Sequence, residues 1–239
     1  MQLLSKNLPL KERFAQSGKW YLLGILMLVT FFIWYAVVVE ARTEMLTVAF
    51  LDVGQGDAIF IEAPNGNQLP IDGGPNRALM QELGKVMPLY DRTIDVVIET
   101  HPDKDHIAGL VDVFERYTVG TFLEPGMPST TGVANSLDAA ILKSGTKRVI
   151  ARRGMRIVLD ENVSLTILFP DRDMSGADTN DASVIVRLVY GENEFLLTGD
   201  APQKIENYLV SLDGMELESD VLKAGHHGSK TSTSELFLG

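Results

Sequence analysis

The chain has 239 residues, contains no cysteine and carries a formal net charge of −11. This length allows one domain with a substantial core in addition to an N-terminal extension. The absence of cysteine excludes disulfide bonds, thiolate zinc sites and cysteine nucleophiles.

Residues 20–39 form a run without a charged side chain, rich in Leu, Ile, Val and Phe. A helix of twenty residues rises about 30 Å, which matches the hydrocarbon core of a bilayer. Aromatic residues suited to the membrane interface occur towards both ends of the run, at Trp20, Tyr21, Trp34 and Tyr35. We therefore predict a transmembrane anchor at residues 20–40. A cleaved signal peptide is the alternative, because Val39-Glu40-Ala41 loosely resembles a cleavage site, although the run exceeds the usual signal core of about 7–15 residues.

The tail before this run, residues 1–19, is basic. It contains Lys6, Lys11, Arg13 and Lys19 against the single acid Glu12, a net charge of +3, which leaves −14 for the rest of the chain. The positive-inside rule predicts that the tail is cytoplasmic and that everything after residue 40 lies outside the cytoplasm. Such an acidic domain repels nucleic acid and anionic lipid at long range, but divalent cations bound at an acidic site would reverse the sign locally.

After the anchor, hydrophobic patterning and turn residues predict the following elements in chain order. Strands are expected at 45–51, 58–62, 68–71, 94–100, 119–123, 148–151, 155–159, 163–169, 183–190, 194–198 and 220–223. Helices are expected at 77–90, 106–117, 134–142, 202–211 and 233–238. Strand-rich segments alternate twice with strand–helix segments, which predicts an α/β domain over residues 43–239 with two sheets face to face and helices outside.

The strongest chemical signal is a group of four polar residues directly after the expected strand 94–100. His101, Asp103, Asp105 and His106 lie within six residues and supply two pairs of potential ligands. Two pairs suit two metal ions held roughly 3.5–4 Å apart. Alternatively, Asp103 or Asp105 caps the following helix and the histidines are polar surface residues.

A second polar group also follows a strand. The other two of the four histidines, His226 and His227, are adjacent and lie between Gly225 and Gly228. We expect one of them to bind metal and the other to act in proton transfer or to orient a ligand, and their spacing does not tell which. A solvated loop is the alternative. Asp200 ends another strand, either as a cap or, beside the first group, as a bridging ligand.

Further polar residues lie in turns or at strand ends, and the sequence leaves more than one role possible for each of them. Asp72 ends the strand at 68–71 and either orients neighbouring loops by hydrogen bonds or binds metal directly. Asp52 and Asp57 flank a Gly-Gln-Gly turn, where a turn role is favoured over a catalytic one. Asn180 and Asp181 precede a strand and could line the site.

These motifs together resemble the metallo-β-lactamase-fold domain of ComEC-type competence proteins. The resemblance covers residues 46–239 in order, with the matching motifs at 52–57, 71–74, 100–109, 196–200 and 221–229. It implies an αββα sandwich with a hydrolase site for two divalent metal ions, Zn²⁺ or Mn²⁺. By position it assigns His101 and Asp103 to one ion, Asp105 and His106 to the other, Asp200 to the bridge and His227 as an added ligand. Asp105 and His226 are the catalytic candidates.

The chain departs from the family in three ways. Asp103 stands where the wider superfamily has histidine; the ComEC branch commonly has this aspartate, which favours harder ions such as Mn²⁺. The family carries a large multi-helix channel, whereas one span is expected here. The family chain also continues beyond the His-His-Gly-Ser motif with a strand and a late histidine, so that either this chain is C-terminally incomplete or its site lacks a late contributor.

The leading hypothesis is a membrane-anchored, extracytoplasmic hydrolase that acts on a phosphodiester, such as DNA during uptake, with a metal-bridging hydroxide as nucleophile. The charge of −14 beyond the tail argues against tight binding of long nucleic acid. A different ester or amide substrate is an alternative. A second class of function is a non-enzymatic, metal-stabilised module that binds a protein partner at the envelope.

Overall fold

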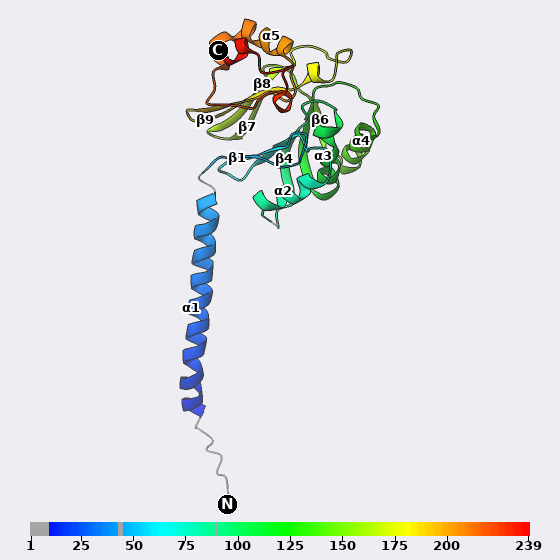
Figure 1. Cartoon of the computed structure of the whole chain (residues 1–239). Coiled ribbons are helices and arrows are strands. Elements are labelled where there is room, and N and C mark those ends of the chain that lie inside the picture. The colour runs from blue at the N-terminus through cyan, green and yellow to red at the C-terminus, as the bar shows by residue number, and fades with distance from the viewer. Residues whose placement is uncertain (1–9, 43–44, 89) are drawn as a thin grey trace, which may run out of the picture. The chain divides into compact units, whose positions relative to one another are not determined.

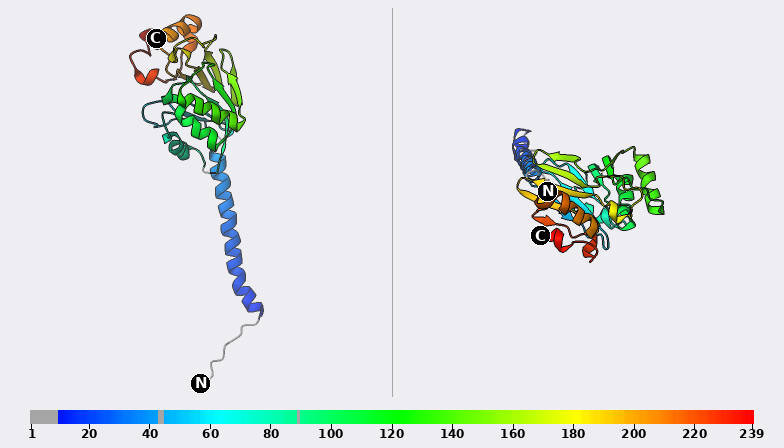
Figure 2. Two further views of the ribbon diagram at one scale, coloured as in Figure 1. Left: turned by 90° about the vertical axis from the view of Figure 1, so that its right-hand side faces the viewer. Right: turned by 90° about the horizontal axis from the view of Figure 1, so that it is seen from above.

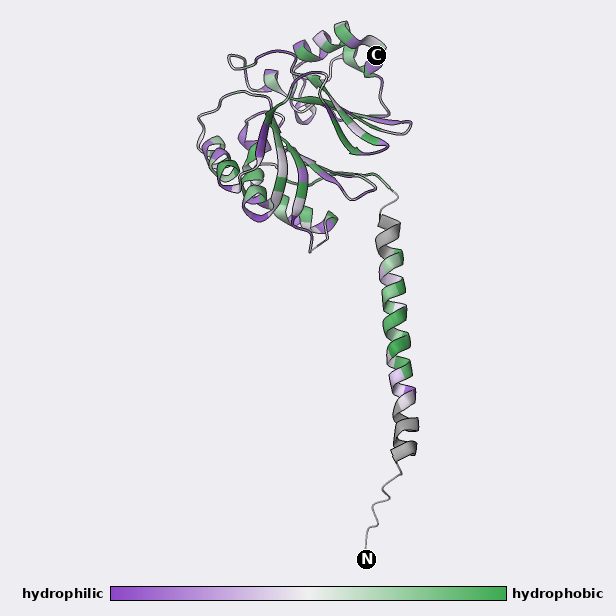
Figure 3. Cartoon of the chain, turned by 180° about the vertical axis from the view of Figure 1, so that it is seen from behind, coloured by the Kyte–Doolittle hydropathy of each residue, from purple (hydrophilic) through white to green (hydrophobic). Residues whose placement is uncertain are grey.

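The computed structural model describes residues 10–42, 45–88 and 90–239. The chain divides into two compact units, Met1–Glu44 and Met45–Gly239. The first contains helix α1 (Leu10–Arg42), in which the window Gly18–Val37 is long and apolar enough to cross a membrane. Its side chains are exposed over this window, and Figure 3 shows its apolar colour. The first nine residues of the predicted basic tail lie outside the described part of the chain.

The second unit contains two sheets (Figure 1). The first has six strands in the order β1 (Thr47–Phe50), β2 (Ile59–Glu62), β3 (Gln68–Ile71), β4 (Thr93–Ile98), β5 (Thr118–Glu124) and β6 (Lys147–Ile150). The β1–β2 and β2–β3 pairs are antiparallel, and β3 to β6 pair in parallel. Crossover helices α2 (Ala78–Val86), α3 (Lys104–Arg116) and α4 (Gly132–Ser144) connect the parallel strands, as parallel pairing requires.

The second sheet has five strands in the order β11 (Val221–Leu222), β10 (Asn193–Leu197), β9 (Ile185–Tyr190), β8 (Val163–Phe169) and β7 (Arg156–Asp160). The pairs from β7 to β10 are antiparallel, and β11 joins the edge in parallel to β10 after helix α5 (Gln203–Asp213). Three short 3₁₀ turns, Asn180–Ala182, Gly214–Leu217 and His226–Gly228, and helix α6 (Glu235–Leu238) complete the described unit.

Three apolar clusters define four layers. Ile61 and Ile98 of the first sheet pack against Leu165 and Val186 of the second, so this cluster lies between the sheets. On its other face the first sheet packs against α2, α3 and α4 through residues such as Val97, Phe122, Leu110 and Leu137. The second sheet packs its outer face against α5 through Leu196 and Leu209. In Figure 2 helices α3 and α4, which cover the first sheet, are green and α5 is orange.

This arrangement is the predicted αββα sandwich. The expected elements are present with shifted ends. Strand β4 ends at Ile98, and α3 begins at Lys104 rather than at 106, so Asp105 and His106 both lie in its first turn.

Candidate metal centre

The candidate site residues come together where strands of both sheets end. Asp72 follows β3, and residues 100–106 connect β4 to α3 in the first sheet. Asp200 follows β10, and His226 and His227 follow β11 in the second sheet. Because β3 and β4 are neighbours, as are β10 and β11, four loops from distant parts of the sequence meet at one edge of the sandwich.

The imidazole of His101 is fully buried and held in one orientation. The hydroxyl of Thr100 donates to Asp72 Oδ2 at 2.6 Å and lies 3.0 Å from His101 Nδ1. Because that hydroxyl proton is used on Asp72, Thr100 Oγ1 accepts from His101 Nδ1–H. Nε2 of His101 therefore presents a lone pair, the form in which histidine binds metal.

His106 is held by the carboxylate of Asp72 directly. His106 Nδ1 donates to Asp72 Oδ2 at 2.8 Å, and both side chains are buried. The loop after β3 comes this close because α3 carries Gly109 where it passes: a Cβ there would lie 2.0 Å from the carbonyl oxygen of Gly73. Asp72 thus orients both imidazoles. Of the two roles considered for it from the sequence, this contact supports the orienting one.

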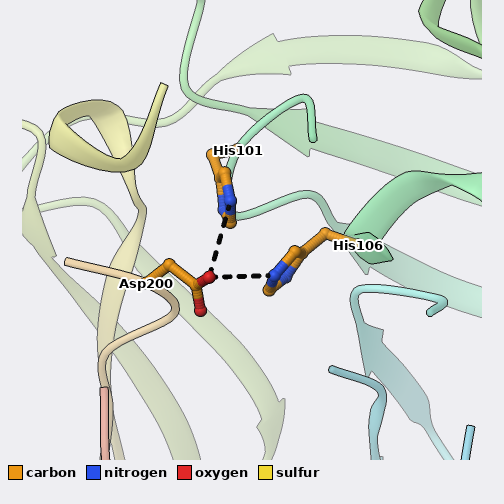
Figure 4. A group of neighbouring side chains, drawn as sticks. All are labelled: His101, His106 and Asp200. Carbon is orange, nitrogen blue, oxygen red and sulfur yellow. Dashed lines mark ion pairs between the residues drawn. The ribbon is translucent and has the colours of Figure 1, made fainter. Parts of the chain in front are cut away.

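The carboxylate of Asp200 faces both imidazoles (Figure 4). Its Oδ2 is 3.3 Å from His106 Nε2 and 4.0 Å from His101 Nε2, and the two rings lie 4.1 Å apart by their centroids. Asp200 is 2% exposed. The single carboxylate from β10 therefore faces both histidines from β4 and α3, the position expected of a shared ligand.

His227 completes the group from the other sheet. Its Nε2 lies 3.4 Å from Asp200 Oδ2 and 3.5 Å from Asp105 Oδ2, and its Nδ1 lies 3.4 Å from Asp57 Oδ1. His226 is more peripheral: its Nε2 is 3.8 Å from Asp200 Oδ2, and its Nδ1 lies 3.1 Å from Thr231 Oγ1. The structure therefore brings His227 among the carboxylates and leaves His226 at the rim.

Asp103 occupies the N-cap position of α3, but its side chain makes no capping hydrogen bond. Its Oδ2 instead accepts from Thr179 Oγ1 at 3.1 Å and lies 3.6 Å from His101 Nε2. The helix-cap interpretation considered for Asp103 therefore has no support in this structure. Lys104, between the two aspartates, is exposed.

Burial and neighbouring charges strongly shift the pKa values of His106, Asp200 and His101. Burial opposes a charge on His106, but Asp72 and Asp200 outweigh it and raise the pKa of His106 to about 10. Burial also penalises a charged Asp200, yet the neighbouring His106, with His101 and Lys223, lowers the Asp200 pKa below its usual range. Burial and the neighbouring His106 lower the pKa of His101 well below 6.5.

The donor atoms fit a metal ion. Nε2 of His101, Nε2 of His106 and Oδ1 of Asp200 are buried and lack a hydrogen-bond partner, an arrangement that a protein rarely leaves uncompensated. Groups with ligand atoms within 4.8 Å of one another include His101–His106–Asp200, Asp105–His106–His227 and Asp57–Asp200–His227. The described residues can thus hold metal, and nitrogen with carboxylate oxygen suits divalent ions such as Zn²⁺.

Two further residues, Lys223 and Asp57, belong to this group, although their sequence context alone does not single them out as site residues. Lys223 Nζ pairs with Asp57, donates to the carbonyl oxygen of Gly199 at 2.8 Å and lies 3.8 Å from Asp200 Oδ1. A turn role was favoured for Asp57, whereas it contacts both Lys223 and His227. The available signal was the place of Lys223, at the end of a short strand just before the histidine pair.

The three remaining candidates, Asn180, Asp181 and Asp52, differ in whether they border the site. Asn180 and Asp181 line a cavity of about 400 Å³ together with Asp103 and His226, so they border the site as considered from the sequence. Asp52 is exposed, and its carboxylate accepts from the backbone of Gly54 within its own turn at 3.4 Å. This contact supports the turn role of Asp52.

The fold has two sheets face to face, and histidines and carboxylates gather where their strands end. This combination of fold and site is that of a metal-dependent hydrolase. The sequence profile of the metallo-β-lactamase superfamily matches residues 51–238, and the chain belongs to this superfamily of metal-dependent hydrolases. The predicted fold, the enzyme class and the resemblance to ComEC-type proteins are thereby confirmed.

Curated relatives are competence and recombination proteins. The chain is 26% identical over 211 residues to ComE operon protein 3 of Bacillus subtilis, covering 80% of this chain and 26% of that protein. It is 32% identical over 193 residues to Recombination protein 2 of Haemophilus influenzae, covering 79% of this chain and 22% of that protein. The chain thus spans about a quarter of the length of these relatives.

Among solved structures, the metallo-β-lactamase fold protein YhfI from Bacillus subtilis superposes with a TM-score of 0.50 at 17% identity. The match covers 74% of this chain and 68% of that one. At this identity the similarity concerns the fold.

Proposed function

We propose that the chain is a membrane-anchored, extracytoplasmic phosphodiesterase that uses two divalent ions, Zn²⁺ or Mn²⁺, and acts on nucleic acid in DNA uptake. The observation that carries the proposal is the convergence of unpartnered Nε2 atoms of His101 and His106 on Asp200. When bound, the ions would supply activation of water and neutralise charge on the departing oxygen.

We assign His101 and Asp103 to one ion, and Asp105, His106 and His227 to the other, with Asp200 shared. The 3.6 Å between His101 and Asp103 and the 3.5 Å between His227 and Asp105 are compatible with this division. His226 is the candidate proton-transfer group, because its Nε2 lies near Asp200 while the ring borders the 400 Å³ cavity that a substrate would enter.

The charge at the site favours an anionic substrate only once metal is bound. Five carboxylates, those of Asp57, Asp72, Asp103, Asp105 and Asp200, face the single cation Lys223 within this group. Two divalent ions would cancel the remaining four negative charges. A phosphodiester could then approach without net repulsion, although the acidic domain around the site still opposes tight binding of a long nucleic acid.

The link to DNA uptake rests on the relatives. One of them is a competence protein, ComA of Neisseria gonorrhoeae, which is 28% identical over 191 residues. The chain covers 25% of that protein, so only this domain is compared. The charge pattern of the N-terminal segment supports an extracytoplasmic domain: the basic residues Lys11, Arg13 and Lys19 lie before or at the start of the apolar window of α1.

Turnover by the full chain in detergent micelles tests the proposal. The metal-loaded chain should hydrolyse bis(p-nitrophenyl) phosphate, and His101→Ala should lower kcat/KM at least about 100-fold because it removes a metal ligand. Chelation with EDTA should abolish the activity, and Mn²⁺ or Zn²⁺ should restore it. Hydrolysis of a carboxylic ester or an amide in place of the phosphodiester would indicate the other substrate class.

A metal-loaded chain that cleaves none of these substrates would contradict the enzymatic proposal and favour the envelope interaction module. The topology is tested separately, in intact spheroplasts. External protease should remove residues 41–239, and full protection of the domain would reverse the assignment.

A further inference from the structure

A second cavity lies on the opposite face of the first sheet from the metal centre. Side chains of a strand alternate between its faces, and the alternation continues past the end of β4: Thr100 contacts Asp72 near the metal centre, whereas Glu99 lines a cavity with Ile107 of α3 and Leu137 of α4. This cavity measures about 310 Å³ and borders the loop after β5. No residue of the metal centre lines it.

Glu99 is the unusual residue of this cavity. It is only 5% exposed, and its backbone N–H donates to Leu123. Its carboxyl group makes no hydrogen bond or ion pair with any residue of the described ranges. A buried polar group without a partner costs free energy, and most such groups in native proteins are satisfied by protein, water or a ligand.

The other charges in the cavity are already paired with one another. Arg148 Nη2 lies 2.6 Å from Glu124 Oε2, its Nε donates to Glu124 Oε1 at 3.0 Å, and its Nη1 lies 2.7 Å from Asp138 Oδ1. The single cation of the cavity is therefore shared between two carboxylates before Glu99 is considered. Glu124 and Asp138 already outnumber the one basic residue, Arg148, and burial raises the pKa of the third acid, Glu99, well above its usual value. This balance disfavours an anion and favours a cation.

Apart from the charged residues, the lining includes apolar side chains that can contact a hydrocarbon stem. They include Pro102, Met127, Pro128 and Leu137. Each group able to hold a metal within the described residues contains His106, Asp57 or both, and none contains Glu99, Glu124 or Asp138. The spread of the carboxylates therefore favours an extended organic cation over a compact metal ion.

We propose that this cavity binds an alkyl chain that ends in an ammonium or guanidinium group, with Glu99 pairing the cationic head and the apolar wall covering the stem. A lysine or arginine side chain of a partner protein and a free amine share this chemistry. The volume of about 310 Å³ lies at the lower end of ligand pockets, which matches one such group rather than a larger ligand.

Binding is measured by NMR on the full chain in detergent, labelled with ¹³C at the methionine methyl groups, with divalent-ion concentration held constant. Met127 lines the cavity and serves as the reporter, assigned through Met127→Leu. n-Butylamine and Nα-acetyl-lysine methylamide should each shift its signal saturably, whereas the uncharged n-butanol should not. A lysine-containing peptide that binds more tightly than both would point to a partner's side chain, and equal affinity would point to a free amine.

Glu99→Gln should weaken amine binding at least about tenfold, because it removes a charged hydrogen-bond partner. Asp138→Asn should weaken it less; its side chain is 51% exposed, so this variant tests the charge of the cavity even if Glu99→Gln fails to fold. Glu161→Gln, the same change at an exposed glutamate in the β7–β8 turn, is the matched control and should bind normally.

Three results would overturn the proposal. They are an absence of any saturable shift with either amine, an equal response to n-butanol, and displacement of the amine by Mg²⁺ at the Met127 signal. Unchanged affinity in both cavity variants is a fourth result that would overturn it.

Discussion

The two histidine pairs of the metal centre are held in different ways. His101 and His106 are fully buried, and their Nδ1 atoms are fixed through Thr100 and Asp72. The side chains of His226 and His227 keep 35% and 23% exposure. The first pair is part of the packed sandwich, and the second is part of its surface.

The backbone shows the same contrast. His106 lies in the first turn of α3, whereas His226 and His227 have φ values of 48° and 52°, in the left-handed region that is unfavourable for residues with a Cβ. Such strain persists only where the surroundings enforce it, and here the N–H of Gly225 donates to Thr233 Oγ1 at 3.0 Å. We infer a preformed half of the site on β4 and α3 and a more adjustable half after β11.

Asp200→Ala should have the largest effect, because Asp200 is the one carboxylate that faces both histidine pairs. We expect metal content to fall at both positions and activity to be lost. Elemental analysis after reconstitution with Mn²⁺ or Zn²⁺ measures this, with Asp52→Asn as the control. Loss of one ion only would show that the halves do not share this ligand.

Within the adjustable half of the site, His227→Ala and His226→Ala should have different effects on metal content. His227 lies among Asp57, Asp105 and Asp200, so its removal should lower metal content as well as turnover. His226→Ala should keep its metal and lose about 10²-fold in kcat, the range for a proton-transfer group. Metal analysis and kinetics on the same preparations decide between the two roles, and the reverse pattern would exchange them.

Asp72→Asn should weaken metal affinity about 10–100-fold, the usual effect of losing an orienting partner. The amide nitrogen cannot accept the bonds that the carboxylate now receives from Thr100 and His106. Competition with a chelating dye measures the affinity. An effect as large as that of Asp200→Ala would mean that Asp72 is itself a ligand.

Metal binding should release a proton and strengthen as pH rises. In the metal-free protein the pKa of His106 is raised from 6.5 to about 10, so this imidazole is protonated at neutral pH, and an ion at Nε2 must displace the proton. Apparent affinity should therefore increase with pH throughout the range below about pH 10 and level off near pH 10. Calorimetry in buffers with different ionisation enthalpies counts the proton. A pH-independent affinity over this window would contradict the shift.

Lys104→Ala should have the smallest effect. Lys104 is exposed at the start of α3, between Asp103 and Asp105, and faces away from the buried pair. We expect kcat/KM within about twofold of the unaltered chain, because exposed residues away from special contacts have small effects. Activity as low as that of His101→Ala would mean that the orientation of this segment is wrong.

Much of the fold could be predicted from the sequence because its signals are local. Apolar runs bounded by Gly, Pro and Asn marked the strands, and helical periodicity marked α3 and α5. The ligand segment 101–106 was recognisable for the same reason: its four potential ligands lie within six residues, shortly after one strand. The order of strand-rich and alternating segments then indicated two sheets.

Which strand ends meet was decided only by the tertiary structure. Asp72 and His106 are 34 residues apart, and they touch because β3 pairs with β4 and because Gly109 lets α3 approach. Lys223 meets Asp57 only because the two sheets bring their edges together. The unpartnered state of Glu99 likewise depends on what surrounds it, since a sequence gives alternation along one strand but not the neighbours across a sheet or between layers.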